Sequence, residues 1–210
     1  MLNINQFENN KATSSGSATD NANEIANVTQ CILRCVNFAS IKHSEQRRKD
    51  AEQTPYINHP IGVAYILAEE AGITEVDVIL AALLHDTVED TDTTFDEIER
   101  CFGVTVRRIV EQVTDDKSLP KAERKRLQVE RAAVATRAAK LVKLADKLYN
   151  LRDLNRSIPI GWNETRVQEY FAWAAQVVAG CRGTNPQLEA ELDNLFSARG
   201  IQVGCRADGD

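Results

Sequence analysis

The stretch AALLHDTVEDTD, residues Ala81–Asp92, joins an apolar run to a group of ionisable side chains. His85 and Asp86 follow the apolar run directly, and Glu89 and Asp90 come one helical turn later. Ionisable groups beside a core-facing segment are costly to bury unless something neutralises them, and a metal ion is one such partner. The stretch therefore predicts a buried helix that carries a charged site.

Start and stop signals place further helices on both sides of this stretch. Pro60 fits the first turn of one helix, which Gly72 is expected to end. Thr74 is the expected N-cap of the helix that continues through the quoted stretch. Thr94 begins a capping box for a short helix, which Gly103 is expected to end.

Helical spacing of apolar residues extends over the rest of the chain. The other expected helices cover residues 25–39, 104–114, 121–131, 141–151, 163–178 and 186–199. Asn163 is the expected cap of the longest late helix, and Gly180 is its expected end. No stretch shows the period-2 alternation of a strand. The expected fold class is therefore all-α, a compact bundle of roughly eight to ten helices.

Length and composition are those of a globular protein with one domain. The chain has 210 residues, of which 43% are hydrophobic and 27% are charged. Residues 1–23 are rich in Asn, Ser and Thr, and we expect them to form a disordered tail. Residues 24–202 are expected to form the folded domain, and residues 203–210 a frayed end.

Charge and hydropathy exclude several function classes. A net charge of −6 argues against nucleic-acid binding through a basic face. No apolar run approaches the roughly 18 residues that span a bilayer, and the N-terminus does not resemble a signal peptide. We therefore expect a cytoplasmic or nuclear protein with a small-molecule ligand and no membrane partner. An oligomer is compatible with the sequence but cannot be read from it.

The cysteine pattern suggests reduced thiols. The five cysteines are Cys31, Cys35, Cys101, Cys181 and Cys205. Their number is odd and no two of them form a CxxC pair, so neither a disulfide framework nor a zinc site is indicated. We expect these thiols to be structural.

Two histidines and two aspartates form the candidate metal site. His59 lies in TPYINHP, just before a helix start, and Asp146 lies in the apolar stripe of KLVKLADKLYNLRDL. Together with His85 and Asp86 they supply two imidazoles and two carboxylates. Such a mixed set can hold a divalent cation and leave coordination sites open for water and a substrate oxygen.

Glu89 and Asp90 are spare carboxylates beside this set. If the helix continues, Glu89 shares a face with His85 and Asp90 shares one with Asp86. They are candidates to activate the water or to protonate a leaving group. Each residue also has an ordinary explanation when taken alone, because an acidic helix end is commonly exposed and a histidine before a proline is commonly a turn residue.

Three long segments resemble a known enzyme family. The order H…HD…D is similar to that of the HD-domain metal-dependent phosphohydrolases. The segments RRKDAEQTPYINHPIGVAYIL, AALLHDTVEDTDTTFDEI and AAKLVKLADKLYNLRDL resemble the hydrolase half of the RelA/SpoT enzymes, in the small stand-alone form found in metazoans. The resemblance covers about residues 30–200. It implies an HD-domain helical fold.

The resemblance assigns roles to the candidate metal residues. It implies that His59, His85, Asp86 and Asp146 are the ligands of a manganese ion. The ligand chemistry by itself also allows zinc or iron. The ED pair of the family implies that Glu89 and Asp90 are the catalytic acidic residues.

The same resemblance implies a set of substrate-binding residues. The RK dipeptide of the family implies Arg48 and Lys49 at the nucleotide, and Asn150 lies one turn after the last ligand. The loop before His59 leaves open whether Arg47 or Arg48 does this work. By resemblance alone, the substrate-binding set also includes Lys121, Arg166 and Tyr170. These cations would supply the local positive field that the net charge does not give.

The resemblance implies hydrolysis of guanosine 3′-diphosphate 5′-di- or triphosphate, (p)ppGpp, with release of pyrophosphate from the 3′ position. This is the alarmone of the stringent response. A phosphatase that removes the ribose 2′-phosphate of NADPH at the same site is an alternative. A nucleotide-binding sensor without turnover is a second alternative, but such a sensor would be expected to lose ligands or acidic residues that this chain keeps. A purely structural helical protein would leave the clustered ionisable residues unexplained.

Overall fold

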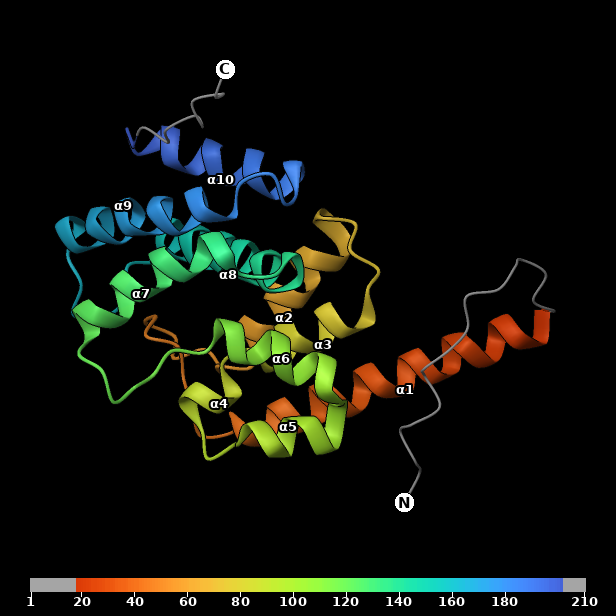
Figure 1. Cartoon of the computed structure of the whole chain (residues 1–210). Helices are drawn as coiled ribbons and strands as arrows, with labels where there is room; N and C mark the ends of the chain where they lie inside the picture. The colour runs from red at the N-terminus through yellow and green to blue at the C-terminus, as the bar shows by residue number, and fades with distance from the viewer. Residues whose placement is uncertain (1–17, 202–210) are drawn as a thin grey trace.

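The protein is a bundle of helices in a computed structural model that describes residues 18–201 (Figure 1). The elements are α1 (Ala18–Lys42), α2 (Asn58–Tyr65), the π-helical η1 (Ile66–Glu70), α3 (Val76–Leu84), α4 (Thr87–Asp90), α5 (Phe95–Phe102), α6 (Val104–Val113), α7 (Lys121–Val134), α8 (Arg137–Arg156), α9 (Glu164–Cys181) and α10 (Pro186–Ala198). Within the described range no strand is present, so the all-α prediction is confirmed.

Helices α3 and α8 form the centre of the core. Every residue of α3 from Val78 to Leu84 is buried, and α8 buries most of its length from Leu141 to Leu154. A helix that is apolar nearly all round must be enclosed on all sides. Accordingly, α3 packs against α1, α2, α6 and α8, while α8 also contacts α9 and α10. Any polar group that these two helices carry is thereby held in a rigid frame.

The first helix begins earlier than the sequence predicted. Helix α1 begins at Ala18, so residues 18–23 are helical and do not belong to the tail expected over residues 1–23. The segment from Ala18 to Lys42 contains neither Gly nor Pro, so nothing in it interrupts a helix. Residues 1–17 and 202–210, which include the expected frayed end, lie outside the described residues.

Side-chain caps fix several of the helix starts. The Thr94 hydroxyl accepts from the Glu97 N–H and the Asn163 side chain accepts from the Arg166 N–H, as the sequence predicted. The prediction for Thr74 is wrong, because Glu75 occupies the N-cap position of α3 and makes no side-chain cap. Helix α3 therefore starts without a side-chain capping hydrogen bond, and its stability comes from the buried residues that follow.

The helix predicted through the quoted stretch is interrupted at the site. Helix α3 ends at Leu84, and α4 begins only at Thr87. The Thr87 hydroxyl donates to the Leu84 carbonyl at 2.7 Å, which satisfies one of the carbonyls left free at the helix end. His85 and Asp86 therefore lie in a turn between two helices and do not lie on a continuous helix face.

Gly180 does not end α9, as its position in the sequence suggested. The helix continues to Cys181, and Gly180 lies where α9 crosses α7. A Cβ atom added at Gly180 would lie 2.9 Å from the Cβ of Ala132 and 2.9 Å from the backbone nitrogen of Ala133. The missing side chain therefore permits the close approach of these two helices.

We expect Gly180→Ala to destabilise the protein. Overpacking against the backbone costs about 1–3 kcal/mol, which exceeds the gain of about 1 kcal/mol in helix propensity. Thermal unfolding followed by circular dichroism should show a lower melting temperature. The control Ala179→Gly, on the exposed face of the same turn, measures the propensity effect alone. A Gly180→Ala variant as stable as the wild type would contradict the close approach.

Two further observations concern the described residues. Cys31, Cys35, Cys101 and Cys181 are free thiols. Among the described residues, no helix is long and apolar enough to cross a membrane.

Candidate metal centre and active site

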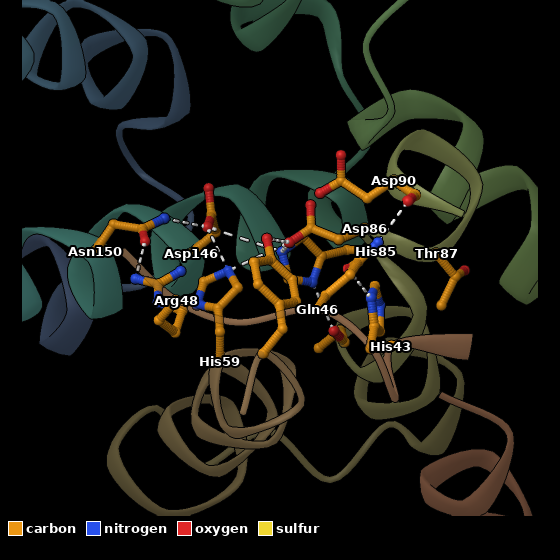
Figure 2. Close-up of polar contacts among 12 residues, drawn as sticks. His43, Gln46, Arg48, His59, His85, Asp86, Thr87, Asp90, Asp146 and Asn150 are labelled. Atoms are coloured by element: carbon orange, nitrogen blue, oxygen red, sulfur yellow. Dashed lines mark hydrogen bonds and ion pairs between the residues drawn. The ribbon is translucent and has the colours of Figure 1, made fainter. Parts of the chain in front are cut away.

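Four predicted ligands converge from three elements of the fold (Figure 2). His59 is near the start of α2, His85 and Asp86 form the turn after α3, and Asp146 lies in the middle of α8. The Nε2 atom of His59 is 3.2 Å from Asp146 Oδ1 and 3.5 Å from Asp86 Oδ2. The Nε2 atom of His85 is 3.1 Å from Asp86 Oδ2 and 3.8 Å from Asp146 Oδ1. Residues far apart in sequence thus meet at one point.

The ring of His85 is oriented as a metal ligand requires. Its Nδ1 atom lies 2.8 Å from the Ala82 carbonyl, an acceptor, so Nδ1 carries the proton. Its buried Nε2 atom makes no hydrogen bond and faces the two carboxylates. A nitrogen lone pair and two carboxylates repel one another unless a cation or a proton lies between them.

The charges around the site also favour a cation between the histidines and the carboxylates. Burial lowers the pKa of His85, but the charges of Asp86 and Asp146 outweigh it and raise that pKa to about 9. Burial raises the pKa of Asp146, yet Lys147 and the two histidines hold it well below its usual range. The site thus draws positive charge to its centre. His59, His85 and Asp146 offer ligand atoms within 4.8 Å of one another, and the set fits a divalent cation.

Neighbouring side chains fix the carboxylates of the centre. The Tyr56 hydroxyl donates to Asp86 Oδ2 at 2.6 Å. Asn150 Nδ2 donates to Asp146 Oδ1 at 2.6 Å, and Lys147 Nζ donates to Asp146 Oδ2 at 2.7 Å. Such partners orient metal ligands in proteins. Sequence reasoning missed Tyr56 and Lys147, although both lie within the quoted segments, because only the fold shows which side chain reaches a ligand.

The third histidine, His43, lies behind the centre. It is 2% exposed, and its Nδ1 atom is 2.6 Å from Gln46 Oε1. Gln46 Nε2 in turn donates to the Asp90 carbonyl at 2.6 Å (Figure 2). The His43 ring also packs against Tyr56, with the centroids 5.0 Å apart. This chain of contacts ties the end of α1 to α4 and was not foreseen from the sequence.

The acidic pair of α4 is held by α7 and by the segment that joins α6 to it. Glu89 Oε2 accepts from the Asp115 N–H at 3.1 Å, and Arg124 Nη1 lies 3.5 Å from Glu89 Oε1. Asp90 forms an ion pair with Lys117. Sequence spacing did not predict these partners, because they come from a different part of the chain.

The environment of Glu89 favours its neutral form. Burial raises the pKa of the Glu89 carboxyl group to about 7. The Asp115 N–H opposes this change, while the charges of Asp115 and Asp86 add to it. A carboxyl group that is half protonated near neutral pH can donate or accept a proton during catalysis.

Arg48 is the arginine that faces the centre. Its guanidinium donates to Asn150 Oδ1 at 3.0 Å and to Asp153 Oδ2 at 2.7 Å. Arg47 instead donates to the carbonyls of Ser44 and Gln46. Of the two arginines, only Arg48 contacts a residue that is hydrogen-bonded to a predicted metal ligand, since Asn150 also donates to Asp146. The Lys49 side chain is exposed.

The remaining predicted residues lie on α7 and α9. Lys121 begins α7 and is exposed, and the Arg166 guanidinium lies 4.3 Å from the centroid of the Trp162 ring. Burial raises the pKa of the Tyr170 hydroxyl to about 12; the charge of Lys147 lowers it and that of Asp146 raises it.

Comparison with known proteins places the chain in a family. The model of the HD domain family matches residues 35–178. A human protein named guanosine-3′,5′-bis(diphosphate) 3′-pyrophosphohydrolase MESH1 is 68% identical over 172 residues, which cover 82% of this chain and 96% of the human protein. The protein of that name from Drosophila melanogaster is 54% identical over 169 residues, covering 80% of this chain and 94% of its own.

A solved structure agrees with these relatives. It is described as a metazoan orthologue of SpoT that hydrolyses ppGpp. It matches this fold with a TM-score of 0.80 at 49% identity, over 90% of this chain and 100% of the other. The chain therefore belongs to the HD domain family and, within it, to the metazoan homologues of SpoT.

Proposed function

We propose that this protein is a metal-dependent hydrolase that converts ppGpp to GDP and pyrophosphate, or pppGpp to GTP and pyrophosphate. The observation that carries the proposal is the convergence of two imidazoles and two carboxylates from α2, the turn after α3 and α8, with Glu89 and Asp90 on α4 directly after that turn. The family relationship agrees with it, since relatives that carry this enzyme name align over nearly their whole length. A nucleotide substrate and a cytoplasmic location fit this activity.

His59, His85, Asp86 and Asp146 would hold the divalent ion. A mixed nitrogen and oxygen set of this kind suits manganese, zinc or iron, and we assign manganese from the family resemblance. When bound, such an ion polarises a phosphoryl oxygen and lowers the pKa of a water molecule. Tyr56, Asn150 and Lys147 hold the carboxylates in place for it.

The acidic pair would move the protons of the reaction. Cleavage of the 3′-pyrophosphate leaves an oxygen on the ribose, and an alkoxide is a poor leaving group unless it is protonated. Glu89, whose pKa is about 7, is suited to donate that proton. Asp90 would accept a hydrogen bond from the attacking water. Arg48, Lys49 and Asn150 would face the nucleotide, with Lys121, Arg166 and Tyr170 around it.

This assignment predicts the direction of the pH dependence. Below its pKa Glu89 is neutral and can donate a proton, whereas above it the group is ionised and cannot. We therefore expect kcat for ppGpp, measured at saturating Mn²⁺, to fall as the pH rises through about 7. A profile of kcat between pH 5.5 and 9 tests this. A kcat that rises through the same range would contradict the proton-donor role.

A competition assay tests the choice of substrate. The nucleotide ppGpp carries a diphosphate on the ribose 3′ position, and NADPH carries a phosphate on the ribose 2′ position. Both compounds are offered to the protein together with Mn²⁺. We expect pyrophosphate from ppGpp to appear with the higher kcat/KM. Orthophosphate from NADPH with the higher kcat/KM would instead make the protein an NADPH 2′-phosphatase that uses the same residues.

A further inference from the structure

The two histidines of the metal centre are held in place in different ways. The Nδ1 atom of His85 lies 2.8 Å from the Ala82 carbonyl, so a hydrogen bond orients that ring. The Nδ1 atom of His59 is buried, and among residues 18–201 no hydrogen-bond partner reaches it. A ligating histidine commonly donates from its second ring nitrogen to a carbonyl or carboxylate group, which sets the direction of the ring. On its Nδ1 side, His59 must therefore be oriented by packing.

Aromatic rings surround the His59 imidazole. The Tyr149 ring packs against it edge to face, with the centroids 4.8 Å apart and the ring planes at 64°. The centroids of the His85 and Tyr56 rings lie 5.0 Å and 5.8 Å from that of His59. Edge-to-face contacts with centroids about 4.5–7 Å apart are a favoured arrangement of aromatic pairs. Of these three rings, that of Tyr149 lies closest to His59.

Tyr149 can reach His59 because residue 62 is a glycine. Gly62 lies on α2 three residues after His59, and Tyr149 lies on α8 three residues after Asp146. Residues three apart on a helix are neighbours on one face. A Cβ atom at position 62 would overlap Cε2 of the Tyr149 ring and lie 2.6 Å from its Cδ2. A side chain at this position would therefore push the ring away from the place where it contacts His59.

The contact of Gly62 with Tyr149 lies beside the ligands that the same two helices carry. Helix α2 packs against α8, and His59 Nε2 lies 3.2 Å from Asp146 Oδ1 (Figure 2). The Arg48 guanidinium lies 5.7 Å from the centroid of the Tyr149 ring, within the range of a cation–π contact. The ring thus contacts a helix backbone, a guanidinium group and a predicted metal ligand.

We infer that Tyr149, lying against the backbone of Gly62, is a positioning residue that holds the His59 imidazole toward the metal. The inference rests on the metal centre of the proposed function, but not on the identity of the substrate. Among the described residues the Tyr149 hydroxyl makes no hydrogen bond, so the ring itself does this work. An imidazole that is already oriented loses less conformational freedom when the ion binds, and the affinity for the ion is correspondingly higher.

The test measures Mn²⁺ affinity by calorimetric titration of the metal-stripped protein, with circular dichroism to check the fold. Gly62→Ala displaces the Tyr149 ring, Tyr149→Ala removes it, and a double variant combines the two changes. Tyr149→Phe keeps the ring and loses only the hydroxyl. Gly180→Ala is the matched control, because it also adds a methyl group to a crowded helical glycine, but at the crossing of α9 with α7.

We expect Gly62→Ala and Tyr149→Ala each to lower the Mn²⁺ affinity about tenfold, the lower end of the effect of losing an outer partner of a metal ligand. The double variant should also lose about tenfold, because both changes remove the same contact. Tyr149→Phe should stay within about twofold of the wild type. Gly180→Ala should bind Mn²⁺ normally, although it unfolds at a lower temperature.

Several results would overturn the inference. They are wild-type affinity in either folded single variant, a loss of about 100-fold in the double variant, or an equal loss in Gly180→Ala. If Gly62→Ala does not fold, Tyr149→Ala and Tyr149→Phe decide the question, since equal affinities in these two would also overturn it. A wild-type protein that bound Mn²⁺ without cleaving ppGpp would contradict only the proposed reaction. Failure of the wild type to bind Mn²⁺ would contradict the metal centre and the inference together.

Discussion

Replacing Asp86 by alanine should abolish both metal binding and hydrolysis. Asp86 Oδ2 lies within 3.5 Å of the Nε2 atoms of His59 and His85, so the variant loses the carboxylate that both imidazoles face. We expect the affinity for Mn²⁺ to fall by more than about 100-fold, because loss of a ligand should exceed the 10–100-fold cost of losing an outer partner. Activity toward ppGpp should fall by about 1,000-fold or more, since the ion supplies several kcal/mol to the transition state.

A matched control separates this effect from a general change in charge. Asp92 lies six residues further on and its side chain is 87% exposed, where it pairs with Lys42. Asp92→Ala removes the same charge and should bind Mn²⁺ normally. Calorimetric titration of Mn²⁺ into both metal-stripped variants, with circular dichroism to check the fold, gives the result. Normal Mn²⁺ affinity and turnover in Asp86→Ala would show that the assigned centre is wrong.

Replacing Glu89 by glutamine should leave Mn²⁺ binding intact and lower kcat. The amide is isosteric and can still accept from the Asp115 N–H, so the local structure should remain. It cannot donate a proton to the leaving oxygen, and general acid catalysis is typically worth about 10²–10⁴ in rate. We expect kcat to fall by that factor with unchanged affinity for Mn²⁺. The decline of kcat above pH 7 should also disappear.

The control for this variant is another glutamate on a neighbouring helix. Glu99 on α5 is exposed and pairs with Arg107, so Glu99→Gln changes the charge without reaching the centre. Its kcat and pH profile should match those of the wild type. If Glu89→Gln retained the wild-type kcat, or if its pH profile kept the same decline, Glu89 would not be the proton donor.

Local signals were sufficient to predict much of the fold. Thr94 and Asn163 cap their helices as expected, because a capping side chain and its N–H partner lie within one turn of sequence. Two other signals were misread. Gly180 was read as a helix end, but its role is set by α7, which lies against it only in the folded chain. Thr74 was read as a cap, but Glu75 occupies the N-cap position of α3 and makes no capping hydrogen bond.

The candidate site also contains residues that the sequence predicted and residues that it did not. His85 and Asp86 were read from an apolar run that ends in charge, and His59 and Asp146 from their settings beside apolar helices. In the fold, the Nε2 atoms of both histidines lie within 3.8 Å of an oxygen of each aspartate. The partners of these residues could not be read from the sequence. Tyr56 and Asp86 are 30 residues apart in the sequence, and Arg124 and Glu89 are 35 residues apart. The periodic spacing of apolar residues does not predict contacts at such separations.

The most direct test of the central claim is the release of pyrophosphate by the metal-stripped wild-type protein. The protein is incubated with ppGpp before and after Mn²⁺ is restored, and GDP, pyrophosphate and orthophosphate are separated and counted. We predict no turnover without metal and, with Mn²⁺, one GDP and one pyrophosphate for each ppGpp consumed. If Mn²⁺ bound to the protein and no pyrophosphate appeared, the protein would not be a ppGpp 3′-pyrophosphohydrolase.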